Sequence, residues 1–250
     1  MDVLIIKIGG NDIDDENFLL ELSSTLRSVN EPVILVHGGG KEISRLQAQL
    51  GISPSYVEGV RITDAESMVL VEMVLCGLVN KRVVGHLVRA GVDAIGLSGI
   101  DRGLIRAVKM PHPEIDMGHT GIVTAVNPAV LRDVLEIGLT PVVAPVCLGD
   151  SVHFNVNADH VAGAIAAALN ANRLIFLTNV PGVLKDDELV AEMSPMQAEA
   201  LIASGTINGG MIPKVRTALA ALQSGVSQVA ITNLAGLASN QATVFRLDRA

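Results

Sequence analysis

The amino-acid sequence predicts an α/β protein, a three-layer αβα sandwich with a central, mostly parallel open sheet. Two observations support this prediction. Short runs rich in Val, Ile and Leu alternate along the chain with longer segments of helical periodicity, which is the pattern of βαβ units. Hydrophobic residues make up 49% of the chain but aromatic residues only 2%, so the core must be aliphatic, as is typical of parallel sheets covered by helices.

Each expected strand is a short apolar run, and each expected helix carries apolar residues at three- and four-residue spacing. Two helices also begin at typical capping residues, Asp64 in one and Ser194 followed by Pro195 in the other. The expected strands, in chain order, cover residues 3–8, 32–36, 94–97, 141–145, 174–177 and 228–231. The expected helices cover residues 16–29, 41–50, 65–90, 128–136, 159–171, 195–204 and 213–224.

Two segments depart from this simple alternation. The helix at 65–90 is apolar around more than one face, so it is either a central core helix or a helix that packs partly against a second subunit. Residues 99–127 place Gly and Pro between short β-prone pieces, which predicts inserted hairpins. The length of 250 residues fits a single domain, with an N-terminal lobe at approximately 1–150 and a C-terminal lobe at 151–250.

The composition disfavours several classes of function. A formal net charge of −8 argues against nucleic acid or an anionic membrane as the main partner, since both favour clustered Lys and Arg. Cys76 and Cys147 both lie in apolar runs, so we expect a reduced, cytoplasmic protein without a disulfide framework. The chain enters a strand-like run without a basic leader, and polar residues interrupt the Ala-rich stretch at 161–184, so we expect neither secretion nor membrane insertion.

Glycine-rich turns follow the first two expected strands, in Lys7-Ile8-Gly9-Gly10 and in His37-Gly38-Gly39-Gly40. Because glycine lacks a Cβ, the backbone there can approach a ligand closely and direct amide N–H groups at anionic oxygens. A single such turn is weak evidence. Two of them at the carboxyl ends of neighbouring strands, where open α/β sheets bind ligands, favour an anion-binding site.

Two lysines far apart in the sequence suit phosphoryl transfer without a P-loop. Lys7 lies in an otherwise apolar strand beside Gly9 and Gly10, and the alternative is a lysine that extends from an edge strand into solvent. Lys214 follows Gly209-Gly210 and Pro213 at an expected helix start. There the ammonium and the helix dipole would both favour bound phosphate.

Three more residues could bind a carboxylate or orient the lysines. Asn155 and Asp159 belong to a segment that enters a helix, and it is either an ordinary N-cap or a substrate-binding group of amides and a carboxylate. Arg61 stands between a Gly turn and the cap residue Asp64, which suits a bidentate contact with a carboxylate. The alternative for Arg61 is a solvent-exposed arginine.

Other catalytic designs lack the residues they need. Gly40-Lys41 is not part of a Walker A motif, because Leu35 stands where its first glycine should be and Glu42 where Ser or Thr should follow. The six histidines show no metal-binding spacing, so we expect no metal held by protein ligands. No Gly-x-Ser-x-Gly elbow occurs and Ser98 has no evident base partner, which disfavours hydrolase chemistry.

Together these segments resemble the amino acid kinase family over nearly the whole chain. The resemblance is closest to members that use ATP to phosphorylate the γ-carboxylate of N-acetyl-L-glutamate in arginine biosynthesis. It implies an acyl amino acid-binding and dimerisation lobe followed by an ATP-binding lobe. The matching segments are Lys7-Ile8-Gly9-Gly10, Val36-His37-Gly38-Gly39-Gly40, Gly59-Val60-Arg61-Ile62-Thr63-Asp64, Glu72-Met73-Val74-Leu75 with Val79-Asn80-Lys81, Asn155-Val156-Asn157-Ala158-Asp159 and Gly209-Gly210-Met211-Ile212-Pro213-Lys214-Val215.

The resemblance also implies a role for each candidate residue. Lys7 and Lys214 would stabilise the transferring phosphoryl group, and Asp159 would orient them. A carboxylate acceptor is already ionised at neutral pH, so no general base is needed. Residues that would hold the acyl amino acid are Gly39, Gly40, Arg61 and Asn155. Residues that would contact ATP, whose Mg²⁺ would be held mainly by phosphates, are Gly9, Gly10, Asn179, Val180, Pro181, Gly182, Val183, Leu184, Thr206, Ile207 and Asn208.

Departures from the family pattern leave two alternatives open. Asn179 stands where Asp is usual, and the segments at 179–182 and 118–121 are closer to members that act on aminoadipate or glutamate linked to a small carrier protein. The segments of Arg61 and Asn155 favour the free acetylated substrate instead, and no Lys/Arg cluster provides a docking rim for an acidic carrier. The other alternative is a catalytically silent, ligand-binding regulator on the same fold.

The resemblance bears on oligomeric state as well. Lys7 lies too near the start of the chain to leave room for the additional N-terminal helix of the hexameric, arginine-inhibited members. We therefore expect a homodimer that arginine does not inhibit.

Overall fold

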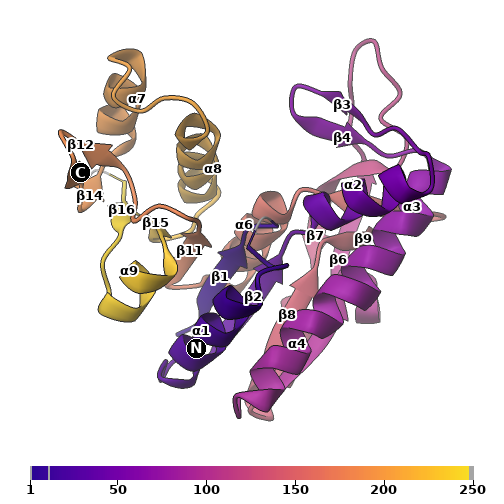
Figure 1. The fold of residues 1–250 in the computed structure, drawn as a ribbon, viewed down its shortest axis with the longest axis horizontal. Coiled ribbons are helices and arrows are strands. Elements are labelled where there is room, and N and C mark those ends of the chain that lie inside the picture. The colour runs from indigo at the N-terminus through magenta and orange to yellow at the C-terminus, as the bar shows by residue number, and fades with distance from the viewer. Residues whose placement is uncertain (1, 11, 248–250) are drawn as a thin grey trace.

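The computed structural model describes residues 2–10 and 12–247. Its main element is an eight-stranded sheet with helices on both faces, so the predicted three-layer α/β architecture is confirmed (Figure 1). Every strand pair in this sheet is parallel except the pair of β15 and β16. In spatial order the strands are β14 (Glu192–Met193), β16 (Thr243–Phe245), β15 (Val229–Thr232), β11 (Arg173–Leu177), β1 (Leu4–Ile8), β2 (Val33–His37), β8 (Thr140–Ala144) and β5 (Ala94–Ser98).

All six predicted strands are in this sheet, each with bounds within one residue of the prediction. β1 lies at its centre, hydrogen-bonded to β11 on one side and β2 on the other. Its side chains alternate between two cores: Ile5 packs on one face, while Leu4, Ile6 and Ile8 pack on the other. Lys7 shares the face of Ile5, so alternation fixes which helix layer its side chain can reach.

The two cores correspond to two layers of helices. The core that contains Ile5 is covered by α5 (Pro128–Glu136), α6 (Ala158–Leu169), α7 (Pro195–Ala203) and α8 (Met211–Gln223). The core that contains Leu4 is covered by α1 (Glu16–Arg27), α2 (Gly40–Gln49), α9 (Leu234–Ser239) and the long helix described next.

The predicted helix at 65–90 is a continuous helical rod with an unpredicted π-helical middle. It comprises α3 (Ala65–Glu72), the π segment η1 (Met73–Val79) and α4 (Asn80–Arg89), and Asp64 caps its start by accepting a hydrogen bond from the Ser67 N–H. One side packs into the core, as predicted, while Val69, Met73, Leu78 and Val88 are exposed on it. Both interpretations offered by the sequence therefore remain compatible with the helix.

Smaller elements surround the sheet. The predicted hairpin in 99–127 is confirmed as β6 (Ile105–Lys109) paired with β7 (Thr120–Val126), and with β9 (Val146–Leu148) and β10 (His153–Val156) it closes a small barrel. Two further hairpins are β3 (Ser55–Val57) with β4 (Val60–Ile62), and β12 (Leu184–Lys185) with β13 (Glu188–Leu189). In the described part of the chain, no helix is long and apolar enough to cross a membrane.

Candidate active site

A cavity of about 420 Å³ opens at the carboxyl ends of β1 and β2. This is the edge at which open α/β sheets bind ligands. Its walls come from the glycine loop after β2, the β3–β4 hairpin, the end of β10 and the start of α6. Six of the residues singled out from the sequence line it: Lys7, Gly39, Gly40, Arg61, Asn155 and Asp159.

Lys7 and Asp159 form an ion pair in this cavity. Lys7 Nζ lies 2.7 Å from Asp159 Oδ1, and the two side chains are only 16% and 25% exposed. Asp159 is in the first turn of α6, whose N-cap Asn157 accepts a hydrogen bond from the Asp159 N–H at 2.8 Å. Because β1 is the central strand, the alternative of a lysine on an edge strand is wrong.

The N-cap interpretation of this segment is confirmed, because Asn157 caps α6 and Asp159 lies in its first turn. Asn155 lies within β10, and its side-chain amide donates to Thr63 Oγ1 at 3.1 Å. The segment changes from strand to helix between Asn155 and Asp159, which places both side chains on the same cavity.

Glycines let two loops come close together beside this ion pair. A Cβ on Gly10 would lie 2.8 Å from the Gly39 nitrogen, so only glycine fits there. α2 begins at Gly40, and no side chain in the described residues caps it. Its first N–H groups are therefore available to an anionic ligand.

Arg61 is buried and held by a dense set of contacts, so the alternative of a solvent-exposed arginine is wrong. Its Nη1 donates to Gln47 Oε1 at 2.5 Å, and its Nη2 donates to the Gly40 carbonyl at 3.1 Å and to Ser44 Oγ at 2.7 Å. The guanidinium also lies 4.8 Å from the centre of the Tyr56 ring. Burial lowers the pKa of Arg61 below its ordinary value.

The supporting residues Gln47, Ser44 and Tyr56 were not identified from the sequence. Ser44 and Gln47 stand three residues apart on α2, a spacing that places them on one helix face. That spacing was the available signal. The sequence did not show that Arg61 would be the partner of this face, because the β3–β4 hairpin meets α2 only in the tertiary structure.

Lys214 approaches the site from α8. It is the fourth residue of α8, near the helix start as predicted, and the helix begins at Met211, two residues before the predicted start. Its ammonium donates to the hydroxyl of Thr178, directly after β11. Burial, and then repulsion from Lys7, lower the pKa of Lys214, which indicates that the two ammonium groups share one electrostatic environment.

Asp12 is a further charged residue near Lys7 and Lys214. It was not identified from the sequence. Its Oδ2 lies 3.2 Å from the position that a Cβ on Gly9 would occupy. Burial raises the pKa of Asp12, while Lys214 and Lys7 act in the opposite direction. A carboxylate two residues after a Gly-Gly turn was the only sequence signal.

The expected nucleotide residues lie outside the cavity lining. Gly9 and Gly10 follow β1, and the others lie around β11 and in the loop before α8. Asn179 and Pro181 follow β11, and Val183 donates its N–H to Thr243 Oγ1 at 2.8 Å. The side chains of Val183 and Ile207 are buried in the core, so only their backbone could face a ligand. Among the others, Asn179, Leu184 and Asn208 are exposed, Val180 and Thr206 are partly exposed, and Gly182 is buried.

His37 and Asn80 form a buried polar pair behind the glycine loop. His37 has no exposed surface and Asn80 is 1% exposed. His37 Nδ1 lies 2.8 Å from the Gly38 carbonyl, and Asn80 Nδ2 lies 3.1 Å from His37 Nε2. Burial, with a smaller contribution from Lys81, lowers the pKa of His37 to about 4, so the imidazole is neutral at physiological pH.

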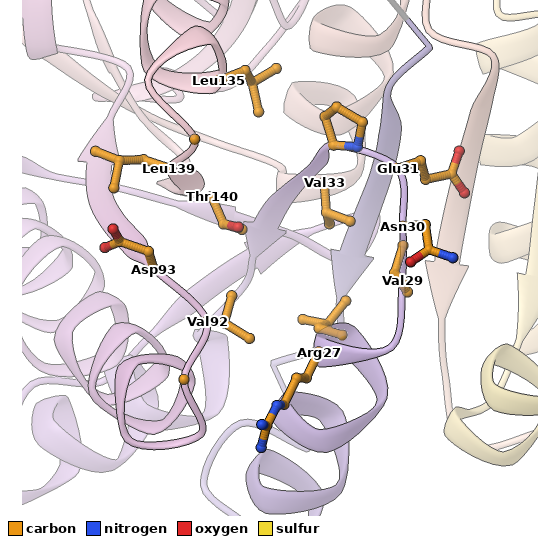
Figure 2. Close-up of a pocket in the computed structure, with 14 residues that line it drawn as sticks. Arg27, Val29, Asn30, Glu31, Val33, Val92, Asp93, Leu135, Leu139 and Thr140 are labelled. Atoms are coloured by element: carbon orange, nitrogen blue, oxygen red, sulfur yellow. The ribbon is translucent and has the colours of Figure 1, made fainter.

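A second cavity, of about 360 Å³, lies at the opposite edge of the sheet (Figure 2). It is lined by the chain that precedes β2, β8 and β5, including Val33, Thr140 and Asp93. It contains none of the candidate residues, and it lies at the amino ends of the strands. The candidate residues therefore gather at the cavity at the carboxyl ends.

Comparisons with known proteins agree with this geometry. The sequence model described as "Amino acid kinase family" matches residues 2–233. The acetylglutamate kinase of Roseiflexus sp. (strain RS-1) is 52% identical over 242 residues, which cover 97% of this chain and 93% of that protein. The acetylglutamate kinase of Methanopyrus kandleri is 43% identical and covers 97% of this chain and 99% of that protein. The solved structure of smu.665 from Streptococcus mutans UA159 superposes with a TM-score of 0.82 at 30% identity, over 99% of both chains.

Buried neutral His37 predicts a loss of stability in acid. Its pKa is about 4 in the folded protein against 6.5 ordinarily, so the unfolded chain binds more protons between these values and stability falls as the pH falls through this window. A fall in pH through the whole window lowers the free energy of unfolding by about 3 kcal/mol. Urea unfolding at about pH 7 and about pH 4.5 measures the effect. The variant His37→Asn should lose most of this pH dependence, and an unchanged slope would assign the acid sensitivity to other groups.

Proposed function

Because the chain belongs to the amino acid kinase family, we propose that its cavity at the carboxyl ends of β1 and β2 is the acceptor site of an ATP-dependent acetylglutamate kinase. The enzyme phosphorylates the γ-carboxylate of N-acetyl-L-glutamate, a step of arginine biosynthesis. The observation that carries this proposal is the Lys7–Asp159 ion pair in one cavity with buried Arg61 and the glycine loop.

The cavity suits a small dianionic acceptor. A volume of about 420 Å³ lies in the range of small-molecule sites. Arg61 carries a buried positive charge that contacts the α-carboxylate, while Asn155 offers an amide to the acetylated nitrogen and its carbonyl. Gly39 and Gly40 allow the γ-carboxylate to approach the N-terminus of α2 closely.

The two lysines then act on the charge that develops during transfer. Lys7 on the acceptor side and Lys214 on the donor side neutralise the phosphoryl oxygens, and Asp159 fixes the direction of Lys7 through the 2.7 Å ion pair. The acceptor carboxylate needs no deprotonation, so alignment and charge neutralisation carry the catalysis. This explains why His37, which directly precedes the glycine loop, can remain neutral and buried.

ATP binds along the C-terminal lobe, residues 151–250. α8 starts at Met211 after two glycines, and no described side chain caps it, so its N-terminus and Lys214 together suit a polyphosphate. Mg²⁺ bound together with ATP would reduce the charge of the phosphates. Among the described residues, no cluster of three or more His, Cys, Asp or Glu side chains could hold a metal ion.

The long helix provides the surface for a homodimer, which we place in the cytoplasm. Val69, Met73 and Leu78 on this helix are each at least half exposed. Exposed aliphatic side chains on one helix favour an interface with a second copy. The remainder of the N-terminal lobe, residues 1–150, binds the acyl amino acid.

Turnover with a panel of acceptors tests the function. We expect release of ADP with N-acetyl-L-glutamate and little with glutamate or with aminoadipate linked to a carrier protein. Lys7→Ala and Lys214→Ala should each lower kcat by roughly 10²–10³ because each removes charge stabilisation of the transition state.

The matched control for the lysine variants is Lys109→Ala, which removes an exposed ammonium that pairs with Asp116 and does not line the cavity. It should leave kcat unchanged. Near-normal turnover by either site variant would remove that lysine from the mechanism. Tight binding of N-acetyl-L-glutamate by the wild-type protein without ADP release would favour the silent regulator instead.

Arg61→Ala should raise the KM for N-acetyl-L-glutamate by about 10–100-fold and change the KM for ATP far less, since it removes a charged hydrogen bond to the acceptor alone. Steady-state kinetics with each substrate varied in turn measure the difference. Arg102→Ala, an exposed arginine paired with Asp133, is the control. Equal increases in both KM values would contradict the assignment.

The dimer is tested by light scattering. The wild-type protein should have twice the 26.1 kDa mass of the chain, and Met73→Glu, which buries a charge in the interface, should shift it to the monomer. Met196→Glu changes another exposed methionine, on α7, and should remain dimeric. A monomeric wild-type protein, or a Met73→Glu variant that stays dimeric, would contradict this interface.

A further inference from the structure

The glycine loop after β2 is held from behind by buried polar groups that do not line the cavity. His37 ends β2, and Asn80 begins α4 on the long helix. Both are essentially inaccessible to solvent. Buried polar side chains cost stability unless they are fully hydrogen-bonded, so a pair of them at the base of a site needs a reason.

Their hydrogen bonds fix the tautomer of the imidazole. The Gly38 carbonyl, 2.8 Å from Nδ1, can only accept, so Nδ1 carries the proton. Nε2 is then an acceptor, which matches the Asn80 amide group at 3.1 Å. The same amide nitrogen donates to the Val142 carbonyl at 2.9 Å, which connects the pair to β8.

The π segment holds the next residue of the loop. The position of a Cβ on Gly39 is filled by Leu75 Cδ2, at 2.5 Å, with Val79 Cγ2 at 3.3 Å. Leu75 and Val79 belong to η1, and Asn80 follows it directly. The widened turn therefore brings apolar contacts to Gly39 and a polar contact to His37 from one stretch of helix, in keeping with the frequent occurrence of π segments at functional sites.

We propose that His37 and Asn80 are positioning residues for phosphoryl transfer, which set the orientation of the loop at 38–40 through the chain Asn80 to His37 to the Gly38 carbonyl. With the Gly38 oxygen bound by Nδ1–H, the N–H groups that follow it face the acceptor carboxylate. The inference rests on the proposed function, since it assigns the loop to the acceptor.

The pair contributes through geometry and not through proton transfer. His37 is sealed from the cavity, and its low pKa keeps the ring neutral under working conditions. The charged group nearest to it on the packed helix is Lys81, whose Nζ contacts Asn80 Oδ1 at 3.1 Å and the Gly96 carbonyl at 3.4 Å. A neutral ring with one donor and one acceptor is what a fixed loop needs.

Two replacements of His37 separate its two hydrogen bonds. His37→Asn places an amide donor near the position of Nδ1 and keeps the bond to Gly38, whereas His37→Gln places its amide near Nε2 and keeps only the contact with Asn80. We expect His37→Asn to keep kcat within about 5-fold, because the bond to Gly38 is kept, and His37→Gln, which loses this bond, to lower kcat by about 10–100-fold with little change in the KM for ATP. Asn80→Ala should lower kcat by a similar factor, because it also removes the hydrogen bond to the Val142 carbonyl that connects the pair to β8. The double variant His37→Gln/Asn80→Ala should lose no more than the worse single variant.

Val83→Ala is the control for general destabilisation, since it removes buried volume from α4 without touching this chain of hydrogen bonds. Its kcat per folded molecule should be normal. Equal losses in His37→Asn and His37→Gln, or normal kcat in His37→Gln, would overturn the inference.

Nitrogen NMR of the imidazole in the wild-type protein provides a test that requires no variant to fold. We expect an Nδ1–H tautomer that does not titrate between about pH 5 and 8. An Nε2–H tautomer or a titrating ring would overturn the inference. This measurement needs no turnover, so its result holds even if N-acetyl-L-glutamate is not the acceptor. If the wild-type protein turns over normally and the variants keep its kcat, only the positioning role of His37 and Asn80 is rejected, and the proposed function stands.

Discussion

The site depends on a charged side chain in a central strand of the sheet. β1 lies at the centre of the sheet between two aliphatic cores, and Lys7 leaves it only at the carboxyl end. An ammonium group at that depth requires a partner, and Asp159 at the start of α6 supplies one at 2.7 Å. The position of α6 on the sheet and the direction of the Lys7 ammonium group are therefore coupled.

The other charged residues of the site are arranged around the Lys7–Asp159 ion pair. A second ammonium, that of Lys214, is brought near the first, and burial with mutual repulsion lowers its pKa. Asp12 and Asp159 offset part of that repulsion. Two ammonium groups held close together repel each other, and a bound anion would relieve this repulsion, which is the basis of the proposed phosphoryl-transfer site. Arg61 follows the same principle on the acceptor side, where carbonyl and amide oxygens hold a buried guanidinium in place.

Close backbone approach is the second requirement, and it connects the cavity to the long helix. Gly10 and Gly39 meet where no Cβ could fit, and the opposite side of Gly39 rests on Leu75 of the π segment. A helix that presents exposed apolar residues on one side thus supports the acceptor loop on the other. Packing of this kind is stiff, so changes at the outer surface of the helix can be transmitted to the loop.

The sequence by itself determined the fold class, the six strands of the parallel sheet and most members of the site, because hydrophobic periodicity and glycine turns are local properties of the chain. It also placed Lys7, Arg61, Asn155 and Asp159 among the candidates. Tertiary structure alone decided that Lys7 is central and not at an edge, that Asn155 is in a strand, and that Asp12, Gln47 and the His37–Asn80 pair support the site. Those assignments depend on which distant segments meet, and burial and hydrogen-bond partners between such segments leave no periodic signal in the sequence.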